Sequence, residues 1–166
     1  MQSIINLLTA LDQAKVAFVL VGGQAMQLHG SLRSTVDVDL VLQMDDANLD
    51  RFVEVAKQFS LKPIIPVSID SLKNAVLIQQ WYEEKGMLAF ALREAAVGGM
   101  VIDVLVRCEV PYEQLNQRAK VGKLNSATIR FASVEDLLTM KRAANRDKDL
   151  TDIAFLESIE SLNKPV

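Results

Sequence analysis

The chain has 166 residues, 50% of them hydrophobic, and carries a formal net charge of −3. These totals predict one globular domain, or one domain with a small helical appendage, and a sizeable core. They exclude global disorder and the overall basic character of many nucleic-acid-binding proteins. Because Cys108 is the only cysteine, no intramolecular disulfide can form, which favours a reducing, cytoplasmic location. No apolar run approaches the roughly 20 residues needed to span a bilayer, so no membrane association is expected.

The first half of the chain alternates helical and strand-like patterns. The predicted elements are a helix over 3–14, a strand over 17–21, a helix over 24–30, a strand over 35–43 and a helix over 45–59. Gly30 ends the second helix, and acidic residues cap the third. Pro63 and Pro66 then break the pattern.

The second half is richer in strands and ends in helices. The segment 68–85 has no clear pattern, and a helix from Ser71 is one interpretation of it. The elements predicted after it are a hairpin of 87–94 and 100–107, a helix over 111–120, a strand over 127–133, and helices over 133–146 and 149–162. Ser133 with Asp136 resembles a capping box, and Asp149 is the expected cap of the last helix. This order predicts an α/β or α+β fold with a mixed sheet, divided into a core over 1–131 and C-terminal helices over 132–166.

The strand at 35–43 contains two carboxylates, Asp37 and Asp39, among valines and leucines. Side chains two residues apart on a strand point to one face, so the pair projects together while Val38 and Leu40 face the core. Two such charges about 4 Å apart repel by roughly 4 kcal/mol at an effective dielectric of about 20. A bound cation relieves that repulsion, and carboxylate oxygens are ligands that Mg²⁺ prefers.

A third carboxylate, Asp103, lies in the apolar run "MVIDVLVR". Three strand aspartates could bind two Mg²⁺ ions about 3.5–4 Å apart, the arrangement used for phosphoryl or nucleotidyl transfer. The alternative is that such aspartates cap turns or lie at exposed strand edges. Gly22 and Gly23 are equally ambiguous, since Gly-Gly ends many strands and no Gly-x-Gly-x-x-Gly pattern is present.

The combination resembles a known family. An apolar strand, Gly22-Gly23, thirteen residues and then Asp37-Val38-Asp39 followed by "LVL" resemble the signature of the DNA polymerase beta-like nucleotidyltransferase superfamily. The segment "SVEDLLTMKRAANRDKDLTDIAFL" is similar to the C-terminal helices of small bacterial and archaeal members related to the AbiEii toxin. This resemblance implies the nucleotidyltransferase fold.

The resemblance also implies roles for individual residues. Asp37 and Asp39 would ligate both Mg²⁺ ions, and Asp103 would ligate the ion that binds the acceptor hydroxyl. Backbone N–H groups of Gly22 and Gly23 would approach the nucleotide triphosphate, and Lys141 and Arg33 are candidates for contacting its phosphates. Arg146 and Lys148 are weaker candidates.

Several of these residues have structural alternatives. Lys141 could belong to a solvated helix face, Arg33 could pair with Asp37 or Asp39, and Asp149 and Asp152 are interpreted as caps and ion pairs joining the last two helices. His29 is expected to pack at a helix end rather than act in catalysis. Trp81 and Tyr82 could belong to the core or a lid, or could stack on a base.

Two functions follow from these observations. The first is an Mg²⁺-dependent nucleotidyltransferase that moves a nucleoside monophosphate from an NTP to a hydroxyl on RNA (tRNA included), protein or a small molecule, with a possible toxin–antitoxin partner protein. The second is a catalytically silent binding or regulatory module, similar to an antitoxin subunit. A third interpretation is a structural α/β domain whose aspartates are surface features. The stretch 107–148 is rich in basic residues, which would favour a nucleic-acid acceptor if their side chains gathered on one face of the protein. These residues are Arg107, Arg118, Lys120, Lys123, Arg130, Lys141, Arg142, Arg146 and Lys148.

Overall fold

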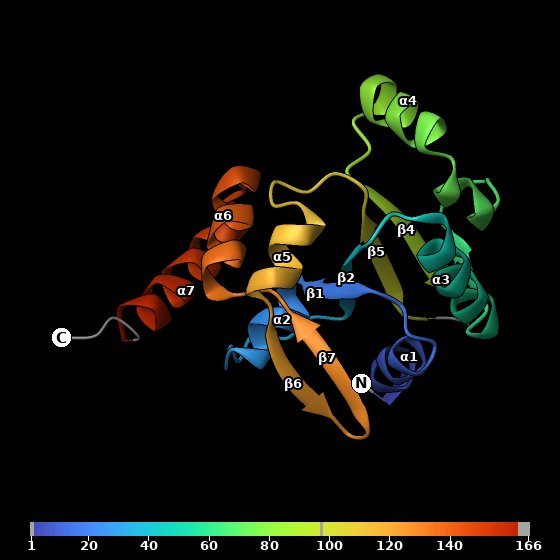
Figure 1. Ribbon diagram of the computed structural model, residues 1–166. Helices are drawn as coiled ribbons and strands as arrows, with labels where there is room; N and C mark the ends of the chain where they lie inside the picture. The colour runs from blue at the N-terminus through green and yellow to red at the C-terminus, as the bar shows by residue number, and fades with distance from the viewer. Residues whose placement is uncertain (1, 97, 163–166) are drawn as a thin grey trace.

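The computed structural model describes residues 2–96 and 98–162, and its centre is a seven-stranded mixed β-sheet (Figure 1). The strands are β1 Phe18–Val21, β2 Asp37–Leu42, β3 Leu61–Pro63, β4 Ala89–Glu94, β5 Val101–Leu105, β6 Lys120–Leu124 and β7 Ala127–Phe131. Their order across the sheet is β3-β4-β5-β2-β1-β7-β6. β2 pairs in parallel with β5, and β1 with β7; the other neighbours are antiparallel. The predicted mixed-sheet fold is confirmed.

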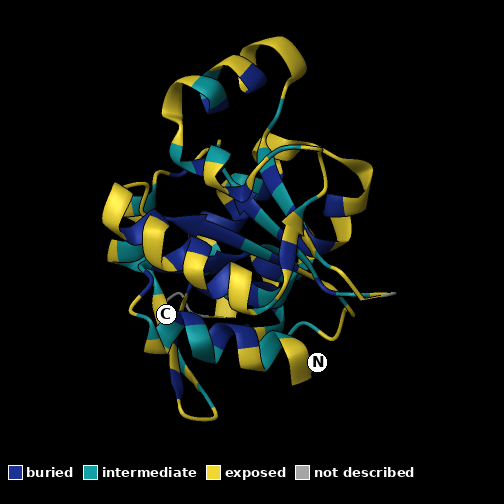
Figure 2. Ribbon diagram, turned by 90° about the vertical axis from the view of Figure 1, so that its right-hand side faces the viewer, coloured by how far each residue is buried: buried dark blue, intermediate teal, exposed yellow. Residues whose placement is uncertain are grey.

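Helices pack against this sheet and close the core. They are α1 Gln2–Gln13, α2 Gly22–Leu28, α3 Asp46–Gln58, α4 Ala75–Lys85, α5 Tyr112–Arg118, α6 Val134–Ala144 and α7 Leu150–Leu162, with 3₁₀ turns η1 Ile69–Lys73 and η2 Asp147–Asp149. Leu7, Leu11 and Phe52 are fully buried where α1 and α3 meet the sheet. By contrast α4 projects from the body in Figure 1, and most of its surface is exposed in Figure 2. Among the described helices, none combines the length and hydropathy required to cross a membrane.

The sequence does not predict the two edge strands. β3 includes Pro63, which we interpreted as a break; proline is tolerated there because β3 lies at the sheet edge. β6 begins at Lys120, so the predicted helix over 111–120 is too long and ends at Arg118. Asn125, with φ 54°, then turns the chain into β7.

Helix caps account for the boundaries in the remaining segments. The segment 68–85, for which the sequence gives no clear prediction, forms η1 and α4. The helix α4 begins at Ala75 rather than Ser71 because Asn74 caps it: the Leu77 N–H donates to Asn74 Oδ1 at 3.0 Å. Ser133 caps α6 as predicted, accepting from the N–H of Asp136 at 3.2 Å. The division into a core over 1–131 and helices over 132–166 stays a prediction.

Candidate active site

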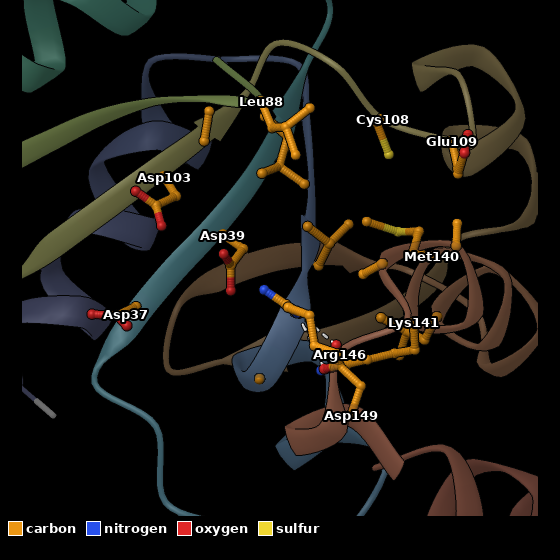
Figure 3. Close-up of a pocket in the computed structure, with 18 of the residues that line it drawn as sticks. Asp37, Asp39, Leu88, Asp103, Cys108, Glu109, Met140, Lys141, Arg146 and Asp149 are labelled. Atoms are coloured by element: carbon orange, nitrogen blue, oxygen red, sulfur yellow. Dashed lines mark hydrogen bonds and ion pairs between the residues drawn. The ribbon is translucent and has the colours of Figure 1, made fainter. Parts of the chain in front are cut away.

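The three strand aspartates meet at one place in the sheet. In the parallel pairing of β2 with β5, Asp39 lies opposite Asp103, and Asp37 lies opposite Val101. Figure 3 shows the three carboxylates on these neighbouring strands, at the edge of a cleft. On the other face of β2, Val38 is completely buried. The alternation of polar and apolar residues on β2 therefore places two carboxylates at the cleft and anchors the strand in the core.

Gly22 and Gly23 allow the start of α2 to approach this carboxylate cluster. Gly22 has φ +62°, and a Cβ atom there would overlap the Asp39 carboxylate. A Cβ atom on Gly23 would lie 2.8 Å from Thr35 Oγ1, and the Gly23 N–H donates a hydrogen bond to Asp39. The glycines are thus required by the close packing of α2 against Asp39 and Thr35.

Burial and mutual repulsion perturb the carboxylates. Burial, followed by the charges of Asp103 and Asp37, raises the pKa of Asp39 to about 6, although the Gly23 hydrogen bond and the Lys141 charge oppose the shift. Burial and the Asp37 charge also raise the pKa of Asp103. The cluster therefore carries negative charge that the surrounding side chains compensate only in part.

The opposite wall of the cleft is built from an ion-pair cluster between α6, η2 and α7. The Lys141 ammonium donates to Asp149 Oδ1 at 2.8 Å and to Asp152 Oδ2 at 2.6 Å, and its side chain is only 9% exposed. Arg33, from the loop before β2, donates to the same Asp152 oxygen at 2.7 Å. The interpretation of Asp149 and Asp152 as ion pairs joining the last helices is confirmed, and the pairing of Arg33 with Asp37 or Asp39 is wrong.

Arg146 completes the cluster at the rim of the cleft. Its Nε donates to Asp149 Oδ2 at 2.6 Å, while the side chain stays 54% exposed. Burial alone would raise the pKa of Asp149, but hydrogen bonds from Arg146 and Lys141 lower it to about 2. Arg146 and Lys148 both line the cleft, so cations face the aspartates across it.

The cleft has a volume of about 580 Å³, within the usual range for small-ligand sites. Its lining includes Gly22, Gly23, Arg33 and Lys141, together with Leu88 and Arg107. The structure thus brings all seven sequence-predicted site residues to the lining of a single cleft. Whether each contacts a ligand as the resemblance implies stays a prediction.

The three aspartates are compatible with a cation whose remaining ligands come from a substrate. Among the described residues, no three His, Cys, Asp or Glu side chains form a ready-made metal cage. Mg²⁺ rarely needs such a cage, because it commonly binds one or two carboxylates and completes its shell with water and substrate phosphates. Asp39 and Asp103, opposite each other, would provide hard oxygen donors for such an arrangement.

Two other residues named from the sequence have structural roles. The imidazole Nε2 of His29 lies 2.8 Å from the carbonyl oxygen of Ala132, and the ring packs on Phe131. The Trp81 ring stacks on Phe90, with centroids 6.4 Å apart. His29 and Trp81 therefore belong to the packing of the fold.

The residue after Trp81 is different, because Tyr82 lines the cleft beside Arg107. The sequence marks Arg107 only as a member of the basic stretch. Arg107 lies two residues beyond the end of β5, the strand that carries Asp103. That short separation is the sequence signal for its position near the site.

The basic stretch does not form one face. Arg118 is paired with Glu135 and Asp136 on α6, and Arg142 with Glu157 on α7. Lys120, Lys123 and Arg130 lie on the β6–β7 hairpin, whereas Arg107, Lys141, Arg146 and Lys148 line the cleft. The stretch therefore gives no support to an extended nucleic-acid surface.

Comparison with known proteins agrees with this architecture. A family model described as "Nucleotidyl transferase AbiEii toxin, Type IV TA system" matches residues 6–165. No curated protein matches the chain. Two crystal structures share the fold: a protein from Thermotoga maritima assigned as a nucleotidyltransferase (14% identity, TM-score 0.54, covering 97% of this chain and 88% of that one) and an antigenic nucleotidyltransferase-like protein from Paracoccidioides brasiliensis (21% identity, TM-score 0.56, covering 99% and 77%).

Proposed function

We propose that this chain, which belongs to the AbiEii nucleotidyl transferase family, uses Mg²⁺ to transfer a nucleoside monophosphate from an NTP to an acceptor hydroxyl. The observation that carries the proposal is the placement of Asp39 directly opposite Asp103, with Asp37 on the same face, in an open cleft with cations on its far wall. In that arrangement the aspartates are available to a metal ion that contacts the reacting groups, and the cations on the far wall are available to the phosphate charge.

Each group in the cleft has a defined task in this reaction. Asp37, Asp39 and Asp103 would hold Mg²⁺, which would supply electrostatic stabilisation of charge on the transferring phosphate. Asp103 also orients the acceptor hydroxyl. The acceptor oxygen bonds to the α-phosphorus while the bond from that phosphorus to pyrophosphate breaks, and the hydroxyl proton passes to Asp103 or to water.

The triphosphate lies toward the C-terminal helices. Arg146 and Lys148 face the cleft and can neutralise phosphate charge, while Arg33 keeps a 47% exposed side chain there. Lys141 is already bonded to two carboxylates, so its main task is to hold α6 against η2 and α7. Gly22 and Gly23 bring the backbone at the start of α2 close to Asp39 and Thr35.

The family description names a toxin of a type IV toxin–antitoxin system. We therefore infer that this protein acts as the toxin component and that an antitoxin partner opposes its activity. Cytoplasmic location accords with this function and with the single free cysteine, Cys108.

The direct test is transfer of label from each of four α-³²P NTPs, with Mg²⁺, to total RNA, to cell-extract protein or to small hydroxyl compounds. Wild type is compared with Asp39→Asn, which preserves side-chain size. Transfer by wild type alone supports the proposal and identifies the acceptor class. Mg²⁺-dependent NTP binding without any transfer would instead favour the silent regulatory module.

A further inference from the structure

A tyrosine and an arginine that line the cleft form a cation–π pair. The Arg107 guanidinium carbon lies 4.7 Å from the centre of the Tyr82 ring, and both residues line the cleft that contains the three aspartates. Leu88 lines the same cleft. These three side chains are not used by the transfer chemistry described above.

The fold holds this pair in place. Trp81 is buried against Phe90 of β4, so the last turn of α4 is anchored and the next residue, Tyr82, is presented to the cleft. The chain then turns at Gly86, with φ +65°, and the Arg107 N–H donates to the Leu88 carbonyl at 3.2 Å. The chain beside the aromatic ring is therefore tied to β4 through Trp81, and the chain that carries the guanidinium is tied to Leu88, which favours a binding role over an incidental surface contact.

The exposed chemistry around this pair matches one kind of ligand. Tyr82 is 38% exposed and Leu88 is 59% exposed. Within the described residues, no carboxylate lies within salt-bridge distance of Arg107, in contrast to Arg33 and Arg146. An aromatic face, a planar cation and an aliphatic side chain together provide stacking surfaces for a flat, electron-rich heterocycle.

We propose that Tyr82 and Arg107 form a stacking platform for a nucleobase. This inference rests on the proposed function and deepens it, because it assigns the base-binding part of the same cleft. Arg107 follows Asp103 by four residues on the chain leaving β5, so the platform lies on the Asp103 side rather than beside Lys141. The base belongs either to the incoming NTP or to the terminal nucleotide of an RNA acceptor, and the test separates these sources.

The experiment compares wild type with Tyr82→Ala and with Tyr82→Phe, which keeps the ring. Binding of ATP, GTP, CTP and UTP with Mg²⁺, of Mg²⁺–tripolyphosphate, and of a single-stranded RNA octamer with a free 3′ hydroxyl is measured by calorimetry and fluorescence anisotropy. We expect Tyr82→Ala to weaken binding of at least one base-containing probe by about tenfold, and Tyr82→Phe to preserve it. Tripolyphosphate binding should be unchanged in both variants.

The outcome identifies the source of the base. Weaker NTP binding assigns the platform to the incoming nucleotide, and weaker octamer binding assigns it to the acceptor. If Tyr82→Ala binds every NTP and the octamer as tightly as wild type, the platform is wrong while the proposed transfer reaction stands. If wild type binds neither NTP nor tripolyphosphate, the proposed function fails, and this inference fails with it.

Discussion

Asp39 on β2 lies directly opposite Asp103 on β5, its parallel neighbour, so two partly buried carboxylates share one position of the sheet. Burial and the repulsion between them and Asp37 raise their pKa values. Such an arrangement costs stability in the absence of a cation, which is typical of a site selected for binding rather than for folding.

The first prediction concerns that cost. Asp39→Asn removes one charge from the cluster and retains an oxygen that can accept the Gly23 N–H. In metal-free buffer we expect a stabilisation on the order of 1 kcal/mol, seen as a rise of about 2–4 °C in Tm. Asp12→Asn is the control, since Asp12 lies outside the cleft and receives a hydrogen bond from the Thr128 N–H. A Tm for Asp39→Asn below that of wild type would contradict the account.

The second prediction separates backbone strain from close packing at Gly22. Gly22 and Gly86 have nearly the same positive φ, +62° and +65°, but only at Gly22 would a Cβ atom overlap another group, Asp39; at Gly86 nothing lies within 4 Å. We expect Gly86→Ala to cost about 1 kcal/mol and Gly22→Ala to cost at least 2 kcal/mol more. Urea unfolding measures both, and equal losses would show that the approach of α2 to Asp39 is not constrained.

The third prediction concerns Lys141. Lys141→Met leaves Asp149 and Asp152 buried with less compensation, which should destabilise the fold by about 3–5 kcal/mol. The matched control is Arg142→Met on the same helix, whose pair with Glu157 is exposed and contributes about 0–1 kcal/mol. Denaturant unfolding distinguishes the two. If Lys141→Met were as stable as Arg142→Met, Lys141 would not be a structural residue.

The fourth prediction is the acid dependence of this cluster. The pKa of Asp149 is lowered to about 2, from 3.8, so its ionised form stabilises the folded state above pH 3.8. That contribution, about 2 kcal/mol, should be lost as pH falls from about 4 toward 2. The free energy of unfolding, measured by urea titration at pH 5, 4 and 3, should fall more steeply for wild type than for Asp149→Asn. Parallel slopes for the two proteins would contradict the assignment.

The sequence predicts the shared face of the strand aspartates better than it predicts the edges of the sheet around them. Period-two alternation in β2 is local, so it correctly placed Asp37 and Asp39 on one face. The register that sets Asp39 opposite Asp103 depends on pairing between segments more than sixty residues apart, which no local pattern encodes.

Long-range pairing also explains the errors. Arg33 is bonded to Asp152, which lies 119 residues away, whereas the nearer Asp37 and Asp39 were the only partners that sequence proximity suggested. β3 and β6 are short edge strands that carry Pro63 and Gly122, and such strands have weak intrinsic signals. Their pairing with β4 and β7 determines their structure.

The proposed function requires that the site formed by Asp39 and Asp103 transfers a nucleotidyl group. The most direct test gives the protein Mg²⁺ and the same NTP labelled either at the α- or at the γ-phosphate, with wild type beside Asp103→Asn. We expect wild type to transfer the α-label to the acceptor and to release the γ-label as pyrophosphate, and we expect Asp103→Asn to be at least 100-fold less active. Transfer of the γ-label to the acceptor, or full activity in Asp103→Asn, would contradict the proposed function.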